Sequence, residues 1–304
     1  MQKKWLYLIV LSLVWGSSFI LIKKALIGLT PLQLGALRTL FAAVFLFLIG
    51  FSKIKSIKKE KWKWIAISGF LGTFIPAFLF AFAETEIDSA VASILNSTTP
   101  IMTLILGAVL FGIVFSRNQL LGVIIGLAGS FLLIWSGAEV NPNQNYWYAI
   151  LVLVASICYA INVNIIKRHL QDIPALGIAV GNFAVLIVPA LIVLIFSGFF
   201  SEEVLTSPKV HTSLGFLVIL AVVGTGIAKV IFNKLVQIST PVFSTSVTYL
   251  IPVVALIWGT MDGEQFSWYQ LLAALLIVFG VYIANRKTRA KKIPPKKAVF
   301  SSDK

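Results

Sequence analysis

Polar side chains lie in the middle of two apolar stretches of this 304-residue chain. The first stretch reads SILNSTTP from Ser93 to Pro100, and the second reads TSVTYLIP from Thr245 to Pro252. A proline inside a helix removes one backbone donor and displaces a carbonyl, so Pro100 and Pro252 predict two helix breaks. The neighbouring hydroxyls and amide either satisfy the freed backbone groups or face a wet cavity.

A constant spacing relates the two stretches. Their prolines stand 152 residues apart (252 − 100), and the same spacing relates Ser93 to Thr245 and Asn96 to Thr248. Such side chains have two readings: they hold a helix bundle together by hydrogen bonds, or they bind a polar substrate. Matched, proline-interrupted spans in two halves of a chain are typical of the substrate site of secondary transporters.

Two basic side chains also lie within apolar stretches, where an unpaired charge costs about 3 kcal/mol or more. Lys229 lies about 22 Å along a helix that begins near Leu214, and Arg38 about 10 Å below the outer end of its helix. Either side chain can snorkel to the membrane surface. Alternatively, Lys229 attracts a substrate carboxylate or phosphate, because no embedded acidic residue neutralises it. Arg38 would then attract anions at a gate, paired with Glu84 in one state.

Aromatic and amide side chains complete the candidate site. Trp15 and Tyr159 lie near the middle of predicted spans, far from the usual interfacial aromatic belts. They either fill the core or pack against an apolar group of the cargo. Ser18, Asn162 and Asn182 are further candidates for hydrogen bonds to a substrate.

Motifs for covalent chemistry are absent. The two histidines, His169 and His211, fall in predicted loops, and no predicted span holds a pair of carboxylates. No glycine-rich phosphate loop precedes a Lys-Ser or Lys-Thr pair. The single cysteine, Cys158, excludes an internal disulfide. We therefore expect no enzyme activity, no catalytic residue, no metal and no cofactor.

The composition predicts a protein that crosses a membrane many times. Hydrophobic residues make up 59% of the chain and charged residues only 12%, with a mean hydropathy of +0.96. A soluble domain of this length lacks the interior to bury so much apolar surface. The net charge of +14 falls in predicted loops and tails, so it indicates topology rather than nucleic-acid binding.

Ten stretches are long and apolar enough to be spans. They are 5–22, 31–51, 62–83, 90–112, 119–135, 147–166, 174–198, 214–235, 242–259 and 271–284. With the N-terminus in the cytoplasm, the lysine cluster from Lys53 to Lys63 and the basic tail from Arg286 also fall inside, whereas Glu84, Glu86 and Asp88 fall outside. The positive-inside bias thus predicts a multi-pass plasma (inner) membrane protein with both termini cytoplasmic.

The chain also repeats itself beyond the two prolines. Gly72-Thr73 matches Gly224-Thr225 at the 152-residue spacing, and the pattern Ile-Lys-Lys at 22–24 matches Ile-Lys-Arg at 166–168. The second match sets Trp15 against Tyr159 and Ser18 against Asn162. We therefore predict a five-helix repeat at 1–140, a second at 141–285, and a basic tail at 286–304. Because five is odd, the second repeat enters the membrane from the opposite side, which predicts an all-α membrane protein with inverted-topology halves.

The fifth and tenth predicted spans carry almost no polar residues, so they can face lipid. Gly122, Gly126 and Gly129 give the fifth span a small-residue face that permits close helix packing. Peripheral helices of this kind permit a monomer or a weak dimer.

Several of these motifs together resemble a known family. Trp15-Gly16-Ser17-Ser18-Phe19, Pro31, Arg38, Pro100 and the glycine-rich fifth span are similar to the EamA-type branch of the drug/metabolite transporter superfamily. The resemblance covers both repeats, although the second has Tyr159-Ala160-Ile161-Asn162 where the first has Trp15-Gly16-Ser17-Ser18. It implies a secondary carrier of ten helices, often an exporter of amino acids or other small metabolites. The first four helices of each repeat would enclose its cavity.

The leading hypothesis is an exporter of small polar metabolites, amino acids or related compounds, in a lipid bilayer and without a nucleic-acid partner. The cargo would be a small molecule that can carry a carboxylate. A second reading is an exporter of drugs or cationic compounds. The embedded basic residues would repel a cation, which disfavours this reading. A third is a membrane protein that does not transport, such as a lipid-modifying enzyme or a channel subunit. Because no embedded carboxylate is visible, we expect uniport or exchange, or coupling through a rim residue such as Glu84.

Overall fold

The computed structural model describes residues 2–112, 117–140, 143–263 and 267–285, and this part of the chain is helical and without strands. The predicted basic tail at 286–304 lies outside the described residues. The helices before residue 143 are α1 (Gln2–Ala25), α2 (Pro31–Gly50), α3 (Trp62–Gly69), α4 (Ile75–Ala83), α5 (Ser89–Asn96), α6 (Thr99–Phe111) and α7 (Arg117–Val140). Those after it are α8 (Ala149–His169), α9 (Ala175–Phe196), α10 (Glu202–Thr206), α11 (Pro208–Ile219), α12 (Ala228–Ile238), α13 (Pro241–Thr245), α14 (Ile251–Met261) and α15 (Trp268–Asn285).

Shorter segments link several of these helices. The π-helices are η3 (Phe70–Phe74), between α3 and α4, and η5 (Leu220–Ile227), between α11 and α12. The 3₁₀ turns are η1 (Phe51–Ser56), η2 (Lys59–Lys61), η4 (Tyr146–Tyr148) and η6 (Ser246–Tyr249).

Within the described residues, eight helical runs are long and apolar enough to cross a membrane. They are Lys3–Ala25, Pro31–Ser56, Lys59–Ala83, Ser89–Phe111, Tyr146–His169, Ala175–Phe196, Pro208–Ile238 and Pro241–Met261. Large apolar side chains also cover the outside of the bundle: Leu48 is 82% exposed and Phe196 is 85% exposed. Such a surface suits hydrocarbon rather than water. The prediction of an all-helical, multi-pass membrane protein is confirmed.

Local sequence explains where several helices begin. The Thr30 hydroxyl accepts from the Gln33 backbone N–H, and the Gln33 side chain accepts from the Thr30 N–H, which forms a capping box before α2. Pro31 occupies the first helical turn, where its missing donor costs nothing. At the start of α13 the Thr240 hydroxyl accepts from the Phe243 backbone N–H, and Pro241 follows Thr240.

The helical path is interrupted beside both matched prolines. After α5 ends at Asn96, a turn leads into α6, whose first turn holds Pro100. In the second half, α13 passes into the 3₁₀ turn η6 before α14 begins with Pro252 in its first turn. Hydroxyls near these breaks also donate to backbone carbonyls: Thr98 Oγ1 donates to Leu95 O at 2.8 Å, and Thr248 Oγ1 to Thr245 O at 2.9 Å.

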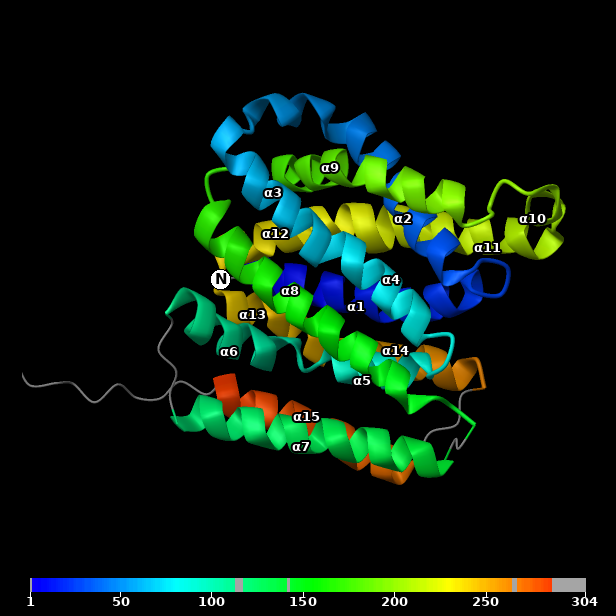
Figure 1. The fold of residues 1–304 in the computed structure, drawn as a ribbon. Coiled ribbons are helices and arrows are strands. Elements are labelled where there is room, and N and C mark those ends of the chain that lie inside the picture. The colour runs from blue at the N-terminus through cyan, green and yellow to red at the C-terminus, as the bar shows by residue number, and fades with distance from the viewer. Residues whose placement is uncertain (1, 113–116, 141–142, 264–266, 286–304) are drawn as a thin grey trace, which may run out of the picture.

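The helices α7 and α15 lie side by side at one edge of the molecule, below the main bundle in Figure 1. Their packing depends on small residues, because a Cβ on Gly280 would lie 2.6 Å from the Gly126 nitrogen and 2.7 Å from the Gly122 oxygen. The glycines singled out in the fifth predicted span therefore hold α7 against α15.

An ion-pair cluster joins the ends of α1 and α14. Asp262, directly after α14, accepts a hydrogen bond from Lys24 and lies 3.0 Å from the Lys23 Nζ. The hydrogen bond from Lys24 lowers the pKa of Asp262 below its ordinary value, and the one from Lys23 lowers it further, against an opposing effect of burial. The charged form of Asp262 therefore stabilises the fold.

Replacement of Asp262 by asparagine is expected to lower stability at neutral pH by about 1 kcal/mol or less, because the cluster is partly exposed. A carboxyl with a lowered folded-state pKa contributes above its unfolded pKa of about 3.9 and loses that contribution as pH falls through the folded pKa. Thermal unfolding of wild type and Asp262→Asn should thus differ at pH 7, and the difference should shrink as pH falls below about 4 and through the folded-state pKa. An equal difference at both pH values would contradict the role of the carboxylate.

Candidate functional site

A cavity of about 100 Å³ lies between the helices of the two predicted halves. Helix α1 contributes four lining residues, and the others come from α2, η3, α4, α5, α6, α8, η5, α12, α13, η6 and α14. The lining comprises Trp15, Ser18, Phe19, Ile22, Arg38, Gly72, Thr73, Phe80, Asn96, Thr99, Tyr159, Asn162, Gly224, Thr225, Lys229, Phe232, Thr245, Val247, Thr248 and Ile251. None of the described side chains of α7 and α15 lines it.

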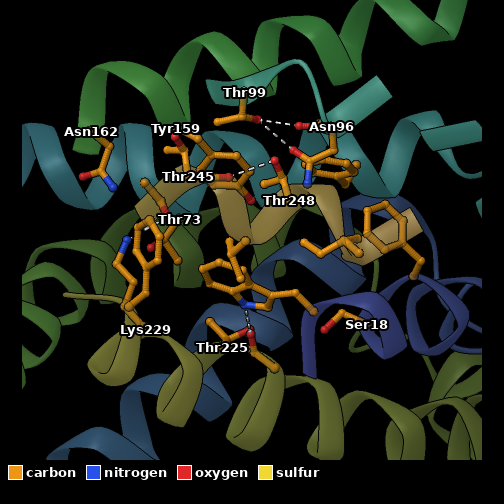
Figure 2. Close-up of a pocket in the computed structure, with 18 of the residues that line it drawn as sticks. Ser18, Thr73, Asn96, Thr99, Tyr159, Asn162, Thr225, Lys229, Thr245 and Thr248 are labelled. Carbon is orange, nitrogen blue, oxygen red and sulfur yellow. Dashed lines mark hydrogen bonds between the residues drawn. The ribbon is translucent and has the colours of Figure 1, made fainter. Parts of the chain in front are cut away.

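Most of the side chains predicted for a substrate site meet at this cavity (Figure 2). Those that line it are Trp15, Ser18, Arg38, Asn96, Tyr159, Asn162, Lys229, Thr245 and Thr248. The other two, Ser93 and Asn182, do not line it. The Ser93 hydroxyl donates to Ala90 O at 2.7 Å within its own helix. Asn182 on α9 is fully buried, and its Nδ2 donates to Ile65 O at 2.6 Å, which holds α9 against α3.

The two embedded basic side chains point into the protein rather than toward the membrane surface. Lys229 is only 5% exposed, and its Nζ donates to Gly72 O at 2.8 Å. Arg38 donates from Nε to Thr225 Oγ1 at 2.7 Å. Among the described residues, the cavity lining holds these two basic residues and no Asp, Glu or His. The charged side chains that line it are therefore basic.

The wall opposite these cations offers oxygen acceptors. Thr99, Thr245 and Thr248 each donate their hydroxyl proton to a backbone carbonyl one helical turn earlier, at 2.7 to 3.1 Å. A hydroxyl that donates in this way keeps its oxygen lone pairs for another donor. In Figure 2 these three threonines and Asn96 lie across the cavity from Lys229 and Thr225. The cavity is thus polarised: the wall with Lys229 and Arg38 presents cationic donors, and the opposite wall presents threonine oxygens as acceptors. The Asn96 amide also lies on that opposite wall, where its Oδ1 accepts from Thr99 Oγ1 at 3.2 Å.

Aromatic rings fill the remaining sides. Trp15 packs against Phe232 with ring centroids 5.0 Å apart, and Phe80 stacks against Tyr159 at 6.2 Å. The Trp15 Nε1 also donates to Gly224 O at 3.0 Å. The rings therefore shape the cavity as well as filling the core, so the two readings of Trp15 and Tyr159 are compatible.

Residue-by-residue reasoning on the sequence missed several lining residues. Thr73, Thr99 and Thr225 bring hydroxyls to the cavity, and Phe80 and Phe232 bring rings. The repeated Gly-Thr pair indicates that Thr73 and Thr225 belong to the site. They are matched polar residues in two apolar spans, as are Asn96 and Thr248. No comparable signal marks Phe80 or Phe232 in a chain with 23 phenylalanines.

Known proteins resemble this chain along most of its length. The model of the EamA-like transporter family matches residues 2–135 and 146–286. The uncharacterized inner membrane transporter YedA of Escherichia coli K12 is 30% identical over 301 residues, which is 97% of this chain and 93% of YedA. The uncharacterized transporter YoaV of Bacillus subtilis is 28% identical over 298 residues, which is 96% of this chain and 100% of YoaV.

The fold also has a counterpart among solved structures. One crystal structure matches with a TM-score of 0.66 and 18% sequence identity, over 92% of this chain and 95% of that chain. This similarity concerns the fold alone. The family model and the relative that is 30% identical lead to one assignment: the chain belongs to the EamA-like transporter family.

Proposed function

We propose that this membrane transporter moves small polar metabolites, amino acids or closely related compounds, and that it works as an exporter. The observation that carries the proposal is the polarised cavity, with Lys229 and Arg38 on one wall and threonine oxygens on the other. An amino acid carries both a carboxylate and an ammonium group, so it suits both walls. The family is one of transporters and not of enzymes, in keeping with the absence of catalytic motifs in the sequence.

Size and charge narrow the cargo further. A cavity of about 100 Å³ is smaller than the about 300–1,000 Å³ of pockets for drug-sized ligands. Two basic residues without an acidic one in the lining favour a carboxylate and repel a simple cation. Both features favour a short amino acid over a large cationic drug, the second candidate.

Transport would proceed by alternating access between two inverted five-helix halves, residues 1–140 and 141–285, within a ten-helix protein. Three observations support this architecture: the π-helices η3 and η5 at equivalent positions, the helix interruptions beside Pro100 and Pro252, and the two family-model matches. The protein would lie in the inner membrane, with both termini and the basic tail cytoplasmic, as a monomer or weak dimer. No carboxylate lines the cavity in the described residues, which favours uniport or exchange over coupling to protons.

Counterflow in proteoliposomes tests this function with three matched compounds. L-serine carries a carboxylate and an amine, glycerate replaces the amine with a hydroxyl, and ethanolamine lacks the carboxylate. We expect saturable counterflow of L-serine, weaker flux of glycerate, and at least about tenfold slower flux of ethanolamine, as the loss of a hydrogen-bonded charge predicts.

Empty liposomes and ethidium serve as controls in the same assay. Preferred transport of ethidium would replace this proposal with the drug-exporter reading. Flux that rises without saturation would indicate a channel.

A further inference from the structure

The two π-helices form a pair of equivalent niches, one in each half. Gly72 and Gly224 occupy corresponding positions, 152 residues apart (224 − 72), and each is followed by a threonine. Each glycine carbonyl accepts a hydrogen bond from a side chain of the other half: Gly72 from Lys229 Nζ at 2.8 Å, and Gly224 from Trp15 Nε1 at 3.0 Å. π-helices occur frequently at functional sites because they expose backbone groups that a regular helix uses itself.

The polar groups of the second niche are bonded within the protein. Thr225 Oγ1 accepts from Arg38 Nε at 2.7 Å and donates to Leu220 O at 3.1 Å. The Ser18 hydroxyl donates to Val14 O at 2.9 Å, and a Cβ on Gly224 would lie only 2.8 Å from it. In this niche the Thr225 and Ser18 hydroxyls therefore both donate their protons to backbone carbonyls, so neither is left to donate to a ligand.

The first niche differs at the equivalent threonine. Thr73 is 7% exposed, lines the cavity, and its Oγ1 has no hydrogen-bond partner among the described residues. A buried hydroxyl without a partner is costly, so such a group in a native site calls for a ligand or an ordered water. Thr225 satisfies the same requirement through Arg38.

Two further donors converge on this niche. Lys229 uses one of its three N–H donors on Gly72 O, so two remain. The Asn162 Oδ1 accepts from Ser68 Oγ at 2.6 Å, which fixes the amide with its Nδ2 beside Gly72. A Cβ on Gly72 would contact both the Lys229 Nζ and the Asn162 Nδ2. Figure 2 shows Asn162, Thr73 and Lys229 on the same side of the cavity.

We propose that Lys229, Asn162 and Thr73 form the subsite for the anionic group of the cargo, a carboxylate, at the first π-helix. The ammonium of Lys229 balances the single negative charge, while Asn162 Nδ2 and the Thr73 hydroxyl donate to the carboxylate oxygens. The cavity holds one such subsite rather than two. At the second π-helix, Arg38 bonds the Thr225 hydroxyl and Trp15 bonds the Gly224 carbonyl. This assignment rests on the proposed function and identifies where that function recognises the cargo.

Calorimetric binding of glycerate to the purified full-length protein tests the subsite, with ethanolamine as the probe that lacks a carboxylate. We expect wild type to bind glycerate at least about tenfold more tightly than ethanolamine, and Thr73→Val to lose at least about tenfold in glycerate affinity. The Thr73→Ser variant keeps the hydroxyl and should restore most of the affinity. Thermal unfolding of each variant checks that it is folded.

Ser156 on α8 supplies the matched control. Its hydroxyl is also buried without a partner among the described residues, but it does not line the cavity, so Ser156→Ala should bind glycerate like wild type. Equal affinity for glycerate and ethanolamine, unchanged affinity in folded Thr73→Val, or an equal loss in Ser156→Ala would overturn the subsite. Glycerate binding as predicted without serine counterflow would overturn the transport proposal instead.

Discussion

Replacement of Lys229 by methionine is expected to raise the apparent KM for L-serine counterflow by about 10- to 100-fold. The reason is that a hydrogen bond to a charged group contributes about 1.5–3 kcal/mol, and each 1.4 kcal/mol is a factor of ten in affinity. Methionine matches the length and flexibility of the lysine side chain, so it fills the same space without the ammonium. Lys229 is 5% exposed and lines the cavity, so the substitution removes its ammonium from the surface that would contact the cargo.

Three comparisons make this prediction specific. Lys229→Arg retains the charge and should be less affected than Lys229→Met. Lys234 lies on the same helix, α12, but is exposed, so Lys234→Met should transport serine with an unchanged KM. Ethanolamine flux should not fall further in Lys229→Met, because this probe has no carboxylate to lose. An unchanged KM for serine in folded Lys229→Met would contradict the anchoring role of the ammonium.

Replacement of Gly280 by alanine is expected to lower the thermal midpoint by about 5 °C. The new Cβ would lie 2.6 Å from the Gly126 nitrogen and 2.7 Å from the Gly122 oxygen, and these backbone atoms can give way only if α7 and α15 separate. Overpacking of this kind typically costs about 1–3 kcal/mol, and each kcal/mol lowers the midpoint of a protein of 150–250 residues by about 2–4 °C. The KM for serine should remain unchanged, because no described side chain of either helix lines the cavity.

Gly215 is the matched control for this variant. It also lies within a helix, α11, but a Cβ built there meets no atom within 4 Å. Gly215→Ala should therefore unfold at the wild-type temperature or slightly above it, since alanine has the higher helix propensity. A Gly280→Ala protein that unfolds at the wild-type temperature would show that α7 and α15 do not pack as closely as the structure indicates.

The fold class can be predicted from the sequence because it depends on the total hydrophobicity of each stretch and not on single contacts. Runs of about 20 apolar residues identify spans whatever their neighbours are. Proline acts locally through its missing donor, so the interruptions near Pro100 and Pro252 could be anticipated as well. Polar residues at matched positions of the predicted repeat, such as Asn96 and Thr248, then identified a large part of the cavity lining.

The direction of a side chain around its helix was harder to predict. Ser93 and Asn96 stand three residues apart beside the same proline, yet only Asn96 reaches the cavity. Asn182 was predicted to bind the cargo, but its Nδ2 donates to the Ile65 carbonyl of α3. Each outcome depends on a neighbouring helix, and helix packing is not encoded in a single span.

The π-helices were not anticipated for a related reason. They contain Gly72 and Gly224, whose carbonyls accept hydrogen bonds from Lys229 and Trp15 of the opposite predicted halves. The Gly-Thr pairs alone do not specify a π-helix, because its formation depends on how the two predicted halves pack together. The distinction between Thr73 and Thr225 likewise depends on where Arg38 lies in the folded protein.

The most direct test of alternating access is the labelling of Ser18→Cys from each side of the membrane. Ser18 lines the cavity, and the native Cys158 is first replaced by alanine so that no other thiol reacts. In right-side-out and inside-out vesicles, a small, membrane-impermeant sulfonated methanethiosulfonate should label this position from both sides, and saturating L-serine should slow the reaction. Labelling from one side only, with and without serine, would contradict a cavity that opens to each side in turn.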